Sequence, residues 1–192
     1  TVADLSKDVF SSFQQLCENT GRLSESFLKS DFAMAIDNLR LKEDGYLKRA
    51  AILLFHNEPE RFVPGSFIKI GFFESESDLL FQDEVHGSIL GQAQEAIDLL
   101  LSKYLKAYIT YKGLNRKESY PFPIEALRET ILNAVVHKDY STGVPIQIRV
   151  YEYRSVIWNE GELPEHWTID NLTQQHPSKP FNPDIATVFF QA

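Results

Sequence analysis

Four polar side chains recur at intervals of four residues in the run that ends at His137. They are Glu125, Glu129, Asn133 and His137. At 3.6 residues per turn, such positions form one slowly drifting stripe on a helix. Two glutamates one turn apart repel each other instead of stabilising the helix, which favours a binding or catalytic role for the stripe. The stripe is therefore the first candidate for a functional site.

The residue types near the end of this run suit two further kinds of chemistry. His137 with Asp139 or Ser141 could serve a hydrolase, and Glu129, His137 and Asp139 could ligate a metal ion. A triad is recognised by its geometry and not by closeness along the chain, so both are minor alternatives. The simplest alternative is that the stripe faces water, as polar stripes on helices usually do.

The helices and strands predicted around the stripe determine which surface its side chains face. The pattern predicts a helix from Pro123 to about His137, and the apolar residues of its C-terminal half predict that this half is mostly buried. Strands are expected at 146–151 and 155–158, followed by a loop at 159–161. A long surface loop over 162–183 and a last helix ending near Phe190 complete this part.

The first half of the chain alternates between helical and strand patterns. Apolar spacing predicts helices at 2–18, 32–39 and 89–105. A strand at 67–73 is expected to pair with 79–81, and a short strand follows at 107–111, before a linker over 113–123. The apolar segment 50–55 fits either a helix end or a strand. The alternation indicates an α+β fold.

Composition limits the function classes. Hydrophobic residues make up 43% of the 192 residues, which predicts a folded chain, and the formal net charge is −8. A surface this acidic cannot bind nucleic acid through a broad positive field, so any contact with DNA must be local or made elsewhere.

One local cluster could make such a contact. Its cations are Lys103, Lys106, Lys112, Arg116 and Lys117, and Tyr104, Tyr108 and Tyr111 lie between them. This mixture could hold phosphates and stack bases. The alternative is a solvated helix end followed by a strand whose tyrosines face a core.

The single cysteine, Cys17, excludes an intramolecular disulfide and fits either a reducing compartment or one whose redox state does not matter. No apolar run is long enough to span a membrane, and no export signal is recognisable, so a cytoplasmic location is expected.

Several motifs together resemble one protein family. The run Glu125–Tyr140 with Pro145–Arg149 closely resembles the C-terminal domain of RecG-like bacterial transcriptional regulators that carry an N-terminal Schlafen-type AlbA domain. Segments 50–55, 61–65 and 178–183 resemble other parts of the same family. The resemblance covers most of the chain from about Leu39 onward.

The resemblance implies an α/β two-layer sandwich of the GHKL type, as in histidine kinases and gyrases, over residues 115–192. A smaller α/β connecting region would occupy residues 1–114. It further implies that Asn133 binds Mg²⁺ on the phosphates of ATP, that Glu129 is the general base of a weak ATPase, and that His137 contacts a phosphate.

In the GHKL family, a loop with the pattern Asp-x-Gly-x-Gly recognises adenine. Asn159, Gly161 and Leu163 occupy its three defining positions here, so two of the three depart from the pattern. An asparagine oxygen accepts a hydrogen bond from the adenine amine more weakly than a carboxylate does, and a leucine side chain crowds the ligand.

The resemblance also implies partners outside this chain. DNA would be bound by the AlbA-type domain, expected before Thr1, and a glycine-rich nucleotide-binding segment would follow Ala192. Homo-oligomers are compatible with this organisation. No Gly-x4-Gly-Lys-[Ser/Thr] loop occurs, so helicase activity is not supported.

The sequence therefore predicts a fragment of a transcriptional regulator that contributes an ATP-binding regulatory module. The alternative is a GHKL-like domain without nucleotide that serves as an interaction or dimerisation scaffold.

Overall fold

The computed structural model describes residues 1–162, 167 and 179–192 and has the predicted α+β fold. Its α-helices are α1 (Lys7–Thr20), α2 (Glu25–Leu28), α3 (Phe32–Asn38), α4 (Arg49–Phe55), α5 (Ile89–Leu99), α6 (Ile124–His137) and α8 (Pro183–Gln191). Its strands are β1 (Lys42–Glu43), β2 (Tyr46–Leu47), β3 (Ile68–Phe73), β4 (Leu79–Val85), β5 (Tyr108–Lys112), β6 (Asn115–Ser119), β7 (Ile146–Val150) and β8 (Ser155–Trp158). Short helical turns lie at Val2–Asp4, Pro59–Arg61 and Leu100–Tyr104.

A four-stranded mixed sheet organises the fold, with the strand order β4-β3-β7-β8. The central strands β3 and β7 run parallel, from Ile68 opposite Ile146 to Phe72 opposite Val150. Each edge strand is antiparallel to its neighbour. Parallel strands need a long crossover connection, and here that connection contains β4, α5, a hairpin and α6.

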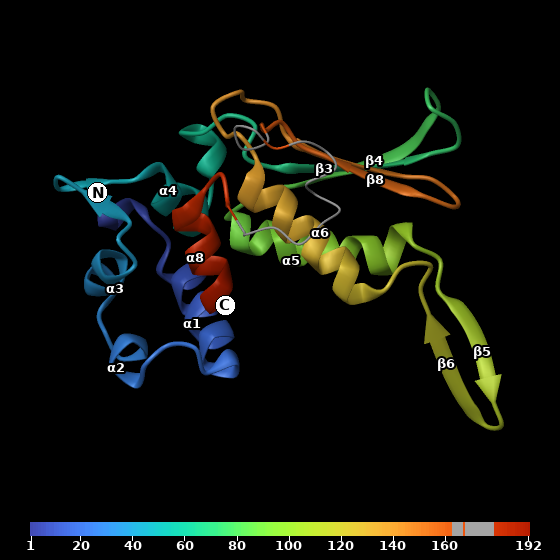
Figure 1. Ribbon diagram of the computed structural model, residues 1–192, viewed down its shortest axis with the longest axis horizontal. Coiled ribbons are helices and arrows are strands. Elements are labelled where there is room, and N and C mark those ends of the chain that lie inside the picture. Colours follow the sequence, from blue (N-terminus) through green and yellow to red (C-terminus); the bar gives the residue numbers. More distant parts are fainter. Residues whose placement is uncertain (163–166, 168–178) are drawn as a thin grey trace.

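Helices α5 and α6 cover one face of this sheet (Figure 1). Buried and half-exposed residues alternate along β7, and this alternation explains why the two faces of the sheet differ. Ile146, Ile148 and Val150 of β7 are buried, whereas Gln147 and Arg149 between them are half-exposed. Side chains two apart on a strand share a face, so one face of β7 points toward the core and the other toward solvent.

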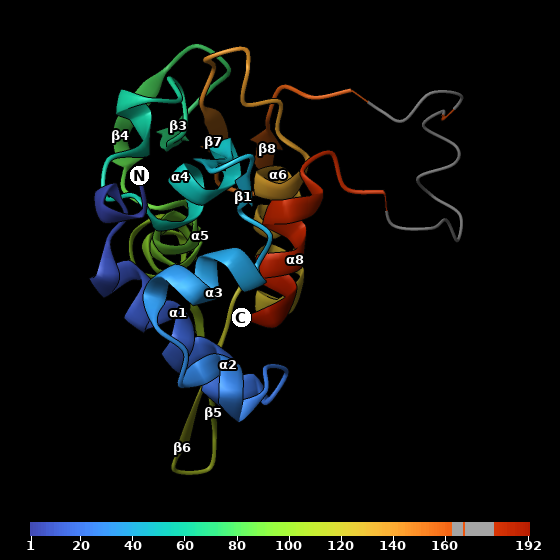
Figure 2. The same ribbon diagram turned by 90° about the vertical axis from the view of Figure 1, so that its left-hand side faces the viewer.

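A second group of helices, α1 to α4 with α8, packs beside the sheet layer, and Figure 2 shows α8 between these helices and α6. Helix α1 begins at the cap residue Ser6, whose hydroxyl accepts a hydrogen bond from the Val9 amide at 3.3 Å. It ends at Gly21, which has φ +64°, a backbone conformation that glycine adopts at little cost.

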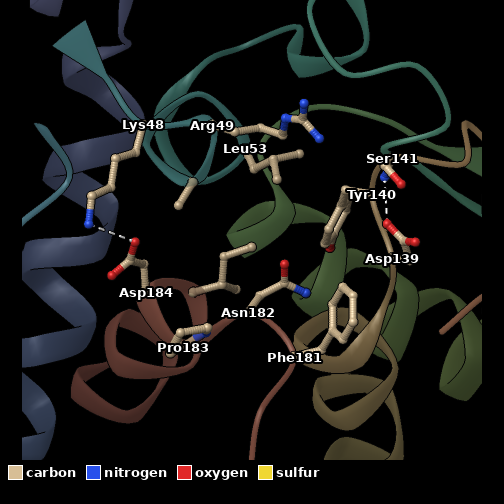
Figure 3. Close-up of a pocket in the computed structure, with 12 residues that line it drawn as sticks. Lys48, Arg49, Leu53, Asp139, Tyr140, Ser141, Phe181, Asn182, Pro183 and Asp184 are labelled. Atoms are coloured by element: carbon tan, nitrogen blue, oxygen red, sulfur yellow. Dashed lines mark hydrogen bonds and ion pairs between the residues drawn. The ribbon is translucent and has the colours of Figure 1, made fainter. Parts of the chain in front are cut away.

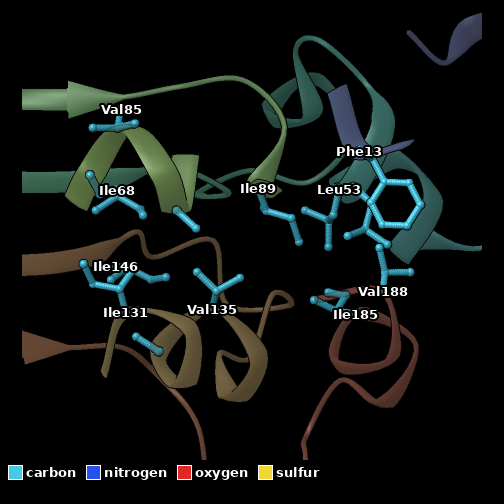
Figure 4. Packing of buried hydrophobic residues seen from close by; sticks show 14 of the residues in the cluster. Phe13, Leu53, Ile68, Val85, Ile89, Ile131, Val135, Ile146, Ile185 and Val188 are labelled. Atoms are coloured by element: carbon cyan, nitrogen blue, oxygen red, sulfur yellow. The ribbon is translucent and has the colours of Figure 1, made fainter. Parts of the chain in front are cut away.

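One continuous hydrophobic core joins the two parts (Figure 4). Phe13 of α1 and Leu53 of α4 lie at one end, Ile185 and Val188 of α8 stand beside them, and Ile131, Val135, Ile68 and Ile146 continue the core beneath the sheet. None of the helices in the described part of the chain is long and apolar enough to cross a membrane.

Most of the predicted elements are confirmed. The ambiguous segment 50–55 is the helix α4, and the predicted linker over 113–123 instead contains β6, which pairs with β5. The short helix α2 and the short strands β1 and β2 were not predicted. The predicted long loop over 162–183 lies mostly outside the described residues, as does Leu163.

The sheet and the core cross the predicted boundary between residues 114 and 115. Strands β3 and β4 come from the first range, and β7 and β8 come from the second. Because β3 pairs directly with β7, the two ranges share one sheet instead of each forming its own.

Candidate functional site

Helix α6 turns its apolar face inward and leaves much of the predicted stripe in solvent. Leu127, Ile131 and Val135 are at most 8% exposed, because they pack beneath the sheet and against α5. Glu129 and Asn133 are exposed. Within the part of the chain that the structure describes, neither side chain makes a hydrogen bond or an ion pair, so both are free to bind a ligand.

The loop after β8 lies against the C-terminal end of α6. The backbone N–H of Asp139 donates to the carbonyl oxygen of Glu160 at 2.7 Å. A Cβ atom on Gly161 would come within 2.6 Å of the His137 carbonyl oxygen, so this close approach requires glycine. The structure thus brings the predicted residues Asn159 and Gly161 next to His137, one turn beyond Asn133.

The His137 ring is half-buried at this junction. Burial disfavours the charged imidazolium and lowers the pKa of His137 below its usual value. The ring is therefore neutral at physiological pH, with one nitrogen able to donate a hydrogen bond and the other able to accept one.

Lys138, directly after the helix, is fully buried. Its ammonium donates to the Asp139 carbonyl oxygen at 3.1 Å and lies 4.7 Å from the centre of the Tyr140 ring. Burial lowers the pKa of Lys138, and the nearby carboxylates of Asp139 and Glu160 oppose that shift. The Glu160 Oε2 atom is itself buried and has no hydrogen-bond partner among the described residues.

Asn182 closes the end of α6 from a distant part of the chain. Its side-chain amide donates to the carbonyl oxygens of Val136 at 2.8 Å and Lys138 at 2.7 Å, and its backbone N–H donates to Val136 at 3.1 Å. These carbonyls have no partner inside the helix, so Asn182 satisfies acceptors that would otherwise remain unpaired. The sequence analysis did not identify Lys138, Glu160 or Asn182.

A pocket of about 270 Å³ lies on the other side of this junction, between α4, the segment after α6 and the start of α8 (Figure 3). Lys48 forms an ion pair with Asp184 across it at 3.0 Å. Asp139 accepts a hydrogen bond from the Ser141 amide at 2.8 Å. None of the predicted site residues Glu129, Asn133, His137, Asn159 and Gly161 lines this pocket.

The two minor alternatives are not supported. Over residues 1–162, 167 and 179–192, no three His, Cys, Asp or Glu side chains form a group that could hold a metal ion, so Glu129, His137 and Asp139 do not make a metal site. The Asp139 carboxylate is bound by the backbone of its own turn, and no hydrogen bond between the side chains of His137 and Asp139 or Ser141 is present in the described structure.

The predicted cationic cluster is divided between two parts of the molecule. Lys103 belongs to the body, where its ammonium pairs with Asp83 at 2.6 Å. Tyr104 is buried, and its hydroxyl donates to the Ile70 carbonyl oxygen at 2.9 Å. Tyr108 and Tyr111 instead lie exposed on the hairpin β5–β6. The alternative of a strand whose tyrosines face a core is therefore wrong, because both tyrosines of β5 are exposed and the buried Tyr104 lies in the helical turn before it.

Comparison with known proteins supports part of this interpretation. Residues 143–192 match an ATPase-domain family described as "Putative ATP-dependent DNA helicase recG C-terminal". The match includes β7, β8, the loop with Asn159 and Gly161, and α8, but it begins after Glu129, Asn133 and His137. This region is therefore similar to the C-terminal part of RecG-like proteins.

A solved structure shares the fold of the whole chain. The crystal structure of the DIP2311 protein from Corynebacterium diphtheriae superposes with a TM-score of 0.76 at 19% sequence identity. The alignment covers 100% of this chain and 37% of that protein, so this chain spans little more than a third of its neighbour's length. A search of curated proteins found no match.

Proposed function

We propose that this chain contributes a nucleotide-binding regulatory module, with ATP and Mg²⁺ held on the open side of α6. The observation that carries the proposal is the contact between the 159–161 loop and the end of α6, beside the exposed and unengaged Asn133. The match of residues 143–192 to a RecG-type ATPase-domain family supports the same conclusion.

The residues present fit a magnesium nucleotide. The amide oxygen of Asn133 is a hard, neutral ligand of the kind that Mg²⁺ accepts when substrate phosphates supply other ligands. Glu129 lies one turn earlier on α6, where an exposed carboxylate could take a proton from water. A bound Mg²⁺ would neutralise phosphate charge that Glu129 alone would repel.

The loop side of the site would hold the base. Gly161 lets the backbone lie close to His137, and the Asn159 side-chain oxygen could accept a hydrogen bond from the adenine amine. The neutral His137 ring could donate a hydrogen bond to a phosphate oxygen without an added positive charge. In this proposal, nucleotide binding biases the arrangement of a DNA-binding domain elsewhere in the full regulator.

One observation favours the alternative of a nucleotide-free scaffold. Asn159 stands where the family pattern has an aspartate, and its neutral oxygen attracts the adenine amine more weakly than a carboxylate would. Its side-chain N–H donates to the Glu160 carbonyl oxygen of its own loop at 3.2 Å, which leaves only this weaker acceptor for a base. On this alternative, the same surfaces serve protein contacts.

Thermal unfolding with and without Mg-ATP tests the proposal. A ligand at about 100 times its dissociation constant stabilises the folded state by roughly 2.7 kcal/mol, which raises the midpoint by several degrees. We expect a magnesium-dependent rise that Asn133→Ala abolishes. Asn38→Ala, at an exposed asparagine in α3, is the matched control and should retain the rise. No rise in the unmodified chain contradicts nucleotide binding and favours the scaffold.

A further inference from the structure

A groove of about 550 Å³ lies on the solvent face of the main sheet. Gln147 and Arg149 of β7 line it together with Val156 and Trp158 of β8. Gln147 and Arg149 alternate with the buried residues of β7, so the groove lies on the face opposite to α5 and α6. A volume of this size is typical of sites for small molecules. The groove is thus separate from the nucleotide site proposed on α6.

Two turns close one end of this groove. The Glu76 carboxylate, in the β3–β4 turn, accepts a hydrogen bond from the Tyr151 hydroxyl at 3.1 Å and forms an ion pair with Arg154 of the β7–β8 turn. The hydrogen bonds from Tyr151 and Arg154 lower the pKa of Glu76, so its carboxylate is charged at neutral pH. Glu76 and Arg154 therefore neutralise each other.

Arg149 is a cation of the groove without such a partner. Among the residues that the structure describes, its half-buried side chain makes no hydrogen bond and no ion pair. Its guanidinium lies 5.0 Å from the centre of the Phe73 ring. Arg149 is opposite Gly71 of β3, and a Cβ atom on Gly71 would come within 2.7 Å of that ring, so glycine leaves the ring room on the sheet. A ring beside a guanidinium holds it without using its hydrogen-bond donors.

An aromatic surface stands next to this free cation. Trp158 is 45% exposed and lies opposite Gln147, whereas Arg149 lies opposite Val156. Trp158 and Arg149 are therefore diagonal neighbours on adjacent strands, which places them about 7–8 Å apart. A ring that carries an acidic group can span this separation, because both side chains are long enough to turn toward it.

The charges of the groove indicate which acidic group fits. Arg149, Arg154 and Glu76 together carry one net positive charge, which a single carboxylate balances. Guanidinium and carboxylate groups are both planar and pair through two parallel hydrogen bonds. A phosphate monoester, with a charge of about −1.5 to −2, would leave an excess of negative charge beside Glu76. The groove therefore favours a monoanion.

A protein partner fits this surface less well. Stable interfaces bury about 800 Å² on each partner, and charged residues are depleted at their centres. Here the exposed apolar side chains are Val156 and Trp158, and the charged Arg149 lies beside them.

We propose that the groove binds a small planar aromatic carboxylate, whose carboxylate pairs with Arg149 and whose ring packs against Trp158. The Gln147 amide, directly opposite Trp158, is in place to hydrogen-bond a polar substituent of the ring. The binding of such a molecule requires neither ATP nor Mg²⁺, so this proposal is independent of the proposed function.

Titration of the intact chain with cinnamate, followed through the NMR signals of the β7 and β8 amides, tests the proposal. We expect saturable shifts. Arg149→Gln should weaken cinnamate binding about tenfold or more, because hydrogen bonds to charged groups are strong. Arg149→Lys, which keeps the charge but not the planar pair of donors, should weaken it by a smaller factor. Trp158→Leu should weaken it roughly threefold to tenfold through the lost ring contact.

The matched control is Arg22→Gln, because the Arg22 guanidinium also lies over a phenylalanine ring, 4.7 Å from the centre of Phe190, but outside the groove. This variant should bind cinnamate as the unmodified chain does. The proposal fails if cinnamate causes no saturable shift in the millimolar range, or if Arg22→Gln weakens binding as much as Arg149→Gln. It also fails if the neutral cinnamamide or the dianionic phenyl phosphate binds as tightly as cinnamate. Sedimentation that shows a dimer dissociated by Trp158→Leu, without cinnamate binding, would overturn it in favour of a second copy of this chain.

Discussion

His137 is the residue at which the two predicted parts of the site meet. Its backbone carbonyl lies against Gly161, and its ring is half-buried near the end of α6. Burial lowers the pKa of the ring, so the folded state holds the neutral form more strongly than the unfolded chain does. A histidine in this position makes the stability of the folded state depend on pH.

The lowered pKa of His137 predicts a loss of stability in acid. Between the folded pKa and the usual value near 6.5, the unfolded chain binds more protons than the folded chain. The contribution of His137 is therefore fully present above 6.5 and is lost as the pH falls through the folded pKa. Urea unfolding at about pH 7 and about pH 5 should show a decrease in the free energy of unfolding that His137→Gln makes smaller.

The control for His137→Gln is His86→Gln, which removes an exposed histidine instead of the half-buried one. The His86 side chain is hydrogen-bonded to Glu60 at 2.8 Å. An NMR titration that places the pKa of His137 at or above 6.5 would contradict the prediction.

The residues that the sequence could identify share a local pattern. Glu129, Asn133 and His137 follow helical spacing, and Asn159 and Gly161 stand in a short motif after a strand. Their presence in one region depends on pairing between segments far apart, which spacing does not encode. Lys138 and Glu160 could not be identified, because a buried lysine and a buried carboxylate oxygen are recognised only from their surroundings.

At the scale of elements, the C-terminal end of α6 depends on α8. Asn182, just before α8, supplies two side-chain hydrogen bonds to carbonyls at the end of α6. Glu160 and Asp139 tie the loop after β8 to the same place. The position of the candidate site is therefore set by three segments at once.

Asn182→Ala should destabilise the protein by about 1–3 kcal/mol, because it leaves the Val136 and Lys138 carbonyl oxygens without their side-chain donor. Urea unfolding measures the change. The control Asn38→Ala removes an exposed asparagine and should change the free energy of unfolding by no more than about 0.5 kcal/mol. An equally small effect of Asn182→Ala would show that these hydrogen bonds are not important to the fold.

Sequence patterns predicted the amphipathic helices and the alternating strands of the main sheet. They failed at β6, where Asn115–Ser119 is polar throughout and pairs only with β5, so no buried face marks it as a strand. The segment 50–55 was ambiguous because it is short and apolar, and its packing against α5 and α8 made it the helix α4.

At the scale of the whole molecule, the parallel pairing of β3 with β7 joins the two predicted regions. It places Ile68 and Ile70 beside Ile146 and Ile148, all of them buried. The boundary at 114/115 is what the family resemblance implies, and hydrophobic periodicity could not have tested it, because periodicity reports local elements and not which strands pair. A strand that is central in the intact sheet becomes an unprotected edge when its partner is removed.

Fragments 1–114 and 115–192 should therefore not fold separately. In the first, the buried side of β3 loses α6 and β7, and in the second, β7 and β8 remain as a two-stranded ribbon, which is only marginally stable. Circular dichroism during heating should show a cooperative transition for the intact chain and none for either fragment. Mixing the fragments could restore the transition, because the shared core would form again. A cooperative transition in the 115–192 fragment alone would instead show that this region folds independently and that the predicted boundary is correct.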